Sequence, residues 1–92
     1  MLSKEKLQEV KGEILGMLYQ HYPESFFTNA IAKHVERDEE LVKRLLLELQ
    51  ERRLVNLEFK SEAPVSRKRM QWRMTKAAKA TYDQKRKAGG EK

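Results

Sequence analysis

The spacing of apolar residues changes from helical to alternating at one point of the chain, close to Arg53. Before this point, apolar residues recur every three or four positions and form one stripe on a helix that follows Asp38 and runs to about Arg53: Leu41, Val42, Leu45, Leu46 and Leu49. After it, alternation with polar residues predicts two half-buried strands, at 55–59 and 70–74. The polar stretch between them, 61–68, contains a proline and several charges, so the two strands are expected to form a hairpin with a long, basic-tipped loop.

Three further segments have the apolar spacing of helices, at about residues 3–22, 29–36 and 76–87. A short extended piece at 25–27 precedes the second of them, which is expected to turn Ala30, Ile31 and Val35 inward. Residues at the starts of the later helices have side-chain oxygens suited to capping them: Thr28, Asp38 and Thr75. The order of elements predicts a mostly helical α+β fold in one domain, residues 1–87, with a disordered tail at 88–92.

Composition narrows the class of protein further. The 92 residues are 39% hydrophobic, enough for one thin core. No apolar run approaches the roughly 18 residues of a membrane span, and the N-terminus lacks the apolar segment of a signal peptide, so we expect a cytoplasmic protein without membrane contact. There is no Cys, the two His have no carboxylate cluster at ligand spacing, and no nucleophile–base pair can be assembled. A binding module is expected, with no enzymatic activity, cofactor or metal.

Positive charge is concentrated in the C-terminal half of the chain. Residues 1–51 hold 7 basic and 10 acidic side chains, and residues 52–92 hold 13 basic and 4 acidic ones, so −3 and +9 add to the net charge of +6. This asymmetry indicates a polyanionic partner such as a nucleic acid. The alternative is that the Lys and Arg residues only keep a small domain soluble.

Two segments carry a resemblance to a known family. The first is Ile31-Ala-Lys-His-Val35, a three-residue turn and the run from Glu39 to Val55; the second is Trp72-Arg-Met-Thr-Lys-Ala-Ala78. With the order of elements over about 26–82, they resemble a winged helix-turn-helix domain of small prokaryotic and archaeal transcription regulators. The resemblance implies DNA binding, with the third helix in the major groove and the hairpin, the wing, along the backbone.

The chain departs from the family pattern at two places. Arg53 stands where the family usually has Gly before the terminal Leu-Val, which suggests a different helix exit. The presumed recognition helix also begins with the acidic run Asp38-Glu39-Glu40.

The predicted DNA-binding residues lie in three places. Opposite the leucine stripe, Lys43 and Arg44 suit guanine, and Leu47 suits a thymine methyl group or a partner protein. The hairpin and its loop carry basic side chains suited to phosphates or a minor groove, and the second helix begins with backbone amides suited to a phosphate. The full set is Thr28, Asn29, Lys43, Arg44, Leu47, Arg67, Lys68, Arg69 and Arg73.

Each of these features has a purely structural alternative. Glu40, Arg44 and Glu48 have the i, i+4 spacing of a surface ion-pair ladder. The basic loop can be a solvated cluster on an edge hairpin, and Thr28 can act only as a cap. The acidic start of the third helix also leaves a second function open, an adaptor that binds a protein or RNA rather than a specific DNA site.

A second apolar stripe on the first helix predicts a further contact. It consists of Leu15, Tyr19 and Tyr22 and is covered either by the C-terminal segment of the same chain or by a partner chain, the first being favoured. With the alanines of the last helix, this stripe is also a candidate surface for a homodimer.

Overall fold

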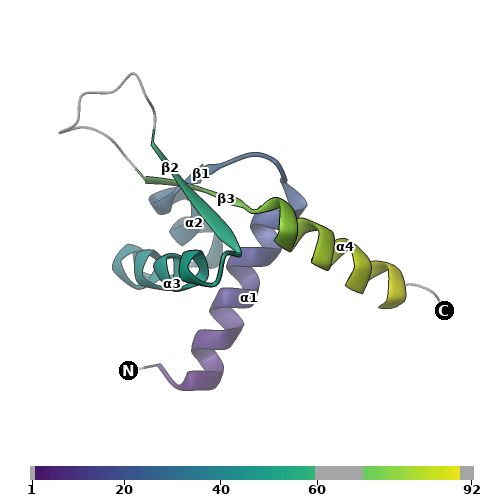
Figure 1. Cartoon of the computed structure of the whole chain (residues 1–92). Helices are drawn as coiled ribbons and strands as arrows, with labels where there is room; N and C mark the ends of the chain where they lie inside the picture. The colour runs from purple at the N-terminus through teal and green to yellow at the C-terminus, as the bar shows by residue number, and fades with distance from the viewer. Residues whose placement is uncertain (1, 60–69, 90–92) are drawn as a thin grey trace.

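The computed structural model describes residues 2–59 and 70–89, with the side chains of 88 and 89 excepted. Figure 1 shows helices packed beneath a small sheet, with the last helix leading away from it. In chain order the elements are α1 (Lys4–Gln20), β1 (Phe26–Phe27), α2 (Thr28–Val35), α3 (Glu39–Glu51), β2 (Val55–Phe59), β3 (Met70–Met74) and α4 (Lys76–Gly89). This order confirms the predicted α+β, winged helix-turn-helix fold. The last helix runs two residues beyond its expected end.

Side-chain caps start three of the helices. The Ser3 hydroxyl accepts from the Lys6 amide, Asp38 accepts from two amides of α3, and the Thr75 hydroxyl accepts from the Ala78 amide at 3.1 Å. Each cap satisfies backbone donors that have no partner within the helix. The predicted caps at Asp38 and Thr75 are confirmed.

The start of α2 differs from the prediction. Phe27 occupies the cap position without a side-chain hydrogen bond, and Thr28 is the first helical residue, so Thr28 does not cap the helix. The helix begins one residue earlier than expected, which adds Thr28 to its buried face. The buried residues have the i, i+3, i+4, i+7 spacing of one helix face: Thr28, Ile31, Ala32 and Val35. Ala30, expected to face inward, is exposed.

The three strands form one antiparallel sheet in the order β1-β3-β2. In the hairpin, Leu57 lies opposite Trp72 and Phe59 lies opposite Met70; on the other edge, Phe26 pairs with Trp72. Alternate residues of a strand face opposite sides, so Trp72 and Met74 enter the core and Arg73 faces outward.

The core is a single cluster to which all the helices and the sheet contribute. Its largest fully buried side chains are Trp72, Ile14, Leu18, Ile31, Leu45 and Leu46. The leucine stripe of α3 is buried as predicted, with Leu41 partly buried at its edge. Burying this stripe fixes which face of α3 is left exposed.

The exit from α3 has the conformation that glycine usually provides. Arg53 has a φ of 62°, its amide donates to the Gln50 carbonyl, and the Leu54 amide donates to the Leu49 carbonyl, each at 2.9 Å. This pair of hydrogen bonds is the Schellman motif. The expectation of a different helix exit is therefore wrong, because the arginine adopts the left-handed conformation. The same turn ends α3 at Glu51, two residues before the predicted end.

The second stripe of α1 is covered by α4 of the same chain, as the favoured alternative predicted. The Tyr19 and Tyr82 rings lie 5.3 Å apart, and the Tyr19 hydroxyl donates to Asp83 at 2.5 Å. Lys79 pairs with Asp83 at 2.6 Å and lies over the rings of Tyr19 and Tyr22. Leu15 is itself buried, so neither it nor these tyrosines form a free surface for a homodimer.

Candidate nucleic-acid interface

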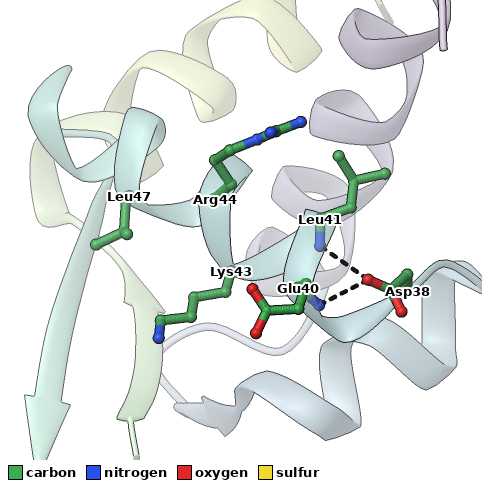
Figure 2. A pocket seen from close by; sticks show the side chains of 6 residues that line it. All are labelled: Asp38, Glu40, Leu41, Lys43, Arg44 and Leu47. Atoms are coloured by element: carbon green, nitrogen blue, oxygen red, sulfur yellow. Dashed lines mark hydrogen bonds between the residues drawn. The ribbon is translucent and has the colours of Figure 1, made fainter. Parts of the chain in front are cut away.

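The exposed face of α3 carries the first group of predicted residues. Asp38 holds the start of the helix, since its Oδ2 accepts from the amides of Glu40 at 3.1 Å and Leu41 at 3.4 Å. The buried stripe turns Lys43, Arg44 and Leu47 outward, and all three are exposed. They line one surface hollow together with Asp38, Glu40 and Leu41 (Figure 2).

Lys43 and Arg44 are both available for a partner. Among residues 2–59 and 70–89, neither side chain takes part in an ion pair or hydrogen bond. Figure 2 shows the two side chains extending in opposite directions from α3, with Glu40 beside Lys43. The ion-pair ladder considered for Glu40, Arg44 and Glu48 is not formed within this part of the chain.

Glu48 instead joins α3 to α1. Its Oε1 lies 2.7 Å from the Nζ of Lys11, whose side chain is buried to about nine-tenths. The hydrogen bond from Lys11 lowers the pKa of the Glu48 carboxyl below its ordinary value. The bond is preserved at neutral pH and weakens as the pH falls through the range in which Glu48 becomes protonated. Lys11 thereby helps to set the position of the candidate recognition helix.

Sequence reasoning missed the role of Lys11. Lys11 follows Val10 and precedes Ile14 by three residues, so it lies on the buried side of α1. A charged residue at such a position is a signal for a buried ion pair, because an isolated buried charge is strongly unfavourable. Its partner, Glu48, is distant in the sequence and becomes visible only when the helices are packed.

Thr28 and Asn29 lie at the start of α2 but differ in environment. The Thr28 side chain is buried and its Oγ1 accepts from the indole Nε1 of Trp72 at 2.8 Å. Its hydroxyl therefore serves the core, whereas Asn29 is exposed and lines a second hollow with Lys43 and Met70. The structure thus brings Asn29 and Lys43 together at the junction of α2, α3 and the hairpin.

Arg73 is separated from this group. It lies on the outer face of the sheet and forms an ion pair with Glu58 of the neighbouring strand. Both side chains are partly exposed, so the pair is weak and open to competition from phosphate.

The predicted wing residues lie outside the described part of the chain. These are Arg67, Lys68 and Arg69. The described strands end at Phe59 and Met70, which are paired, and Met70 lines the second hollow. Phe59 was expected on the buried face of its strand because it alternates with polar residues, but it is half exposed at this end of β2.

Two other kinds of site are absent from the described residues. No group of three His, Asp or Glu side chains there is arranged to hold a metal ion. No helix there is long and apolar enough to cross a membrane.

Comparison with known proteins supports the fold assignment. Neither a protein-family model nor a curated protein matches the sequence. Among solved structures, MepR of S. aureus, in a complex with DNA, is 24% identical over 90% of this chain, with a TM-score of 0.74. ZitR of Lactococcus lactis is 19% identical over 92% of this chain, with a TM-score of 0.70.

A third similar structure is a homodimeric winged helix-turn-helix DNA-binding domain from Mycobacterium bovis, described as a possible ArsR-family transcriptional regulator. It is 17% identical over 95% of this chain, with a TM-score of 0.72, and the match covers 75% of that domain. The chain spans 66% of the MepR chain and 60% of the ZitR chain. These likenesses show that the chain has the winged-helix fold.

Proposed function

We propose that this chain is a DNA-binding transcriptional regulator that places α3 in the major groove and its hairpin along the backbone. The observation that carries the proposal is the pair of exposed cations on α3, Lys43 and Arg44, which have no partners in the described residues. Lys43 also lines a hollow with Asn29 at the start of α2. Lysine and arginine are the side chains that most often read guanine in the major groove.

Charge and fold support the same function. The C-terminal half carries a net charge of +9, from 13 basic and 4 acidic residues, and supplies the hairpin and its loop. MepR, whose fold is similar, was solved in a complex with DNA, and the Mycobacterium bovis domain is described as DNA-binding. No catalytic or cofactor-dependent step forms part of the proposal.

Fluorescence anisotropy with a labelled random-sequence duplex tests the proposal. Each phosphate neutralised by the protein contributes about −0.9 to the slope of log affinity against log salt. We expect measurable binding at low salt and a slope of several units. An absence of binding to any duplex at low salt contradicts the proposal.

One observation favours a second function, an adaptor for a protein or RNA. The N-cap of α3, Asp38, and its first two residues, Glu39 and Glu40, are acidic and exposed, and negative charge there repels phosphates. A basic protein surface matches this end of the helix better than DNA does. Structured RNA and single-stranded DNA in the same titration separate the two functions, because the proposed regulator prefers duplex DNA over both.

A further inference from the structure

Leu47 is an exposed apolar residue on a charged helix face. Its exposed fraction is 38%, and among the described residues only Phe59 is a comparably exposed large hydrophobic side chain. Its neighbours at i−4 and i−3 are Lys43 and Arg44, and the residue at i+4 is Glu51, all exposed. The core does not require an apolar residue here, because Val42, Leu45, Leu46 and Leu49 already form the buried stripe.

A single exposed leucine is common and by itself indicates nothing. The second observation is the hollow that Leu47 shares with Lys43 and Arg44 (Figure 2). Figure 2 shows Leu47 and Lys43 extending to the same side of α3, whereas Arg44 extends to the other side. Apolar surface and one cation without a partner in the described residues therefore face the same way. A partner on this side must offer hydrogen-bond acceptors for the lysine and a small apolar group for the leucine.

The major groove of DNA has this combination. Guanine presents two acceptors, O6 and N7, and thymine presents a methyl group at C5. Along a helix, four residues advance by roughly 6 Å, which corresponds to about two base-pair steps of 3.4 Å. A leucine four residues beyond Lys43 is therefore spaced to meet a base close to the one that the lysine contacts.

We propose that Leu47 is a specificity-determining residue that contacts the 5-methyl group of a thymine within about two base pairs of a guanine bound by Lys43. The inference rests on the proposed function and adds a preferred base to it. It also separates DNA from RNA, since uracil lacks the methyl group.

The experiment removes only the methyl group. A preferred duplex is obtained by enrichment from random sequences, and each thymine is replaced in turn by deoxyuridine. Burial of one methyl group corresponds to about a fourfold change in affinity. We expect one position at which the wild-type protein binds uracil about fourfold more weakly than thymine.

Variants then assign the contact to its residue. Leu47→Ala is expected to bind the thymine and uracil duplexes equally, and Leu47→Met, which keeps an apolar side chain of similar length, is expected to retain most of the preference. Phe59→Ala is the matched control, because it removes the other exposed apolar side chain and leaves α3 intact. It is expected to keep the full preference for thymine.

The outcomes separate the inference from the proposed function. Equal wild-type binding to all thymine and uracil duplexes overturns the role of Leu47 and leaves DNA binding intact. A preference that persists in Leu47→Ala, or an enriched site without thymine, overturns it as well. Failure to bind any duplex at low salt overturns both proposals. Alanine is a strong helix former, so loss of α3 does not explain an effect of Leu47→Ala.

Discussion

The hydroxyl of Thr28 accepts a hydrogen bond from the indole N–H of Trp72, and both side chains are buried. An unpaired N–H at this depth costs about 1–3 kcal/mol. Thr28→Val keeps the volume of the side chain and removes the acceptor, so we expect it to lower the free energy of unfolding by that amount. Urea denaturation measures the change.

Thr28→Ser is the matched control for this variant. It keeps the hydroxyl and removes one methyl group, so its expected loss is only about 0.8 kcal/mol. Equal losses for the two variants would show that packing, and not the hydrogen bond, accounts for the effect. Because the hydroxyl faces Trp72, neither variant is expected to change the DNA affinity of the folded protein.

The backbone conformation of Arg53 is one that a substitution can make more favourable, which would raise the stability of the protein. Its φ of 62° is unfavourable for a side chain with a Cβ and is accessible to glycine. We expect Arg53→Gly to raise the free energy of unfolding by about 1 kcal/mol. Arg52 has a φ of −86°, so Arg52→Gly is expected to lower the free energy by about 0.5–1 kcal/mol. Thermal denaturation of both variants tests this, and a loss of stability in Arg53→Gly would contradict it.

At the scale of elements, α4 is held on α1 by a group of polar contacts around Asp83. Hydrogen bonds from Lys79 and from the Tyr19 hydroxyl lower the pKa of the Asp83 carboxyl below its ordinary value. Since the folded pKa is lowered, this contribution to stability is present above the ordinary carboxyl pKa and is lost as the pH falls through the folded one. Acid is therefore expected to loosen α4.

A carboxyl titration by nuclear magnetic resonance checks the Asp83 contacts directly. We expect the pKa of Asp83 to rise toward its ordinary value in Tyr19→Phe and to rise further in Lys79→Met, because Lys79 is the larger cause. Tyr19→Phe keeps the ring that contacts Tyr82, so the packing of α4 is preserved in that variant. An unchanged pKa in both variants would contradict the assignment.

Elements with strong periodicity were predictable from the sequence. The leucine stripe of α3 and the alternation of β3 specify their own buried faces, and Trp72 and Met74 are buried with the stripe. The alternation of β2 is only partly confirmed, because Val55 is buried but Phe59 is exposed. The start of α2 was not predictable in this way. Thr28 resembles a cap locally, but pairing of β1 with β3 brings its hydroxyl to Trp72.

The candidate site was predictable in part, for the same physical reason. Periodicity identifies Lys43, Arg44 and Leu47 as the exposed face of α3. The ion pair between Lys11 and Glu48, and that between Arg73 and Glu58, depend on contacts between different elements. The spacing of residues within α3 suggested Arg44 as the partner of Glu48. This spacing contains no information about how α1 packs against α3, so it could not identify Lys11.

At the scale of the whole molecule, we expect a homodimer. Because Leu15 is buried and α4 contacts Tyr19 and Tyr22 in the same chain, the surface that remains from the predicted interface is the exposed side of α4, with Ala77 and Ala80. In a two-fold dimer, the two DNA half-sites lie about 10 base pairs apart or a multiple of that.

Sedimentation equilibrium tests the dimer. The wild-type protein is expected to be dimeric at tens of micromolar, and a variant with Ala77→Glu and Ala80→Glu is expected to be monomeric, since it introduces four charges into a two-fold interface. Both alanines are exposed, so the substitutions leave the core unchanged. Only monomer in the wild-type sample would refute the dimer without affecting DNA binding by one chain.

The central claim is that α3 reads bases while the wing contacts the backbone. Affinity measurements over a set of enriched duplexes test it most directly, with Lys43→Ala and Arg44→Ala compared with neutralisation of Arg67, Lys68 and Arg69. The α3 variants are expected to lose about 1–3 kcal/mol on the preferred site and to reduce the differences between sites. The wing variant is expected to weaken binding to all sites alike and to reduce the salt slope by about one unit per lost contact. If Lys43→Ala and Arg44→Ala leave the ranking of sites unchanged, the claim that α3 reads bases is contradicted.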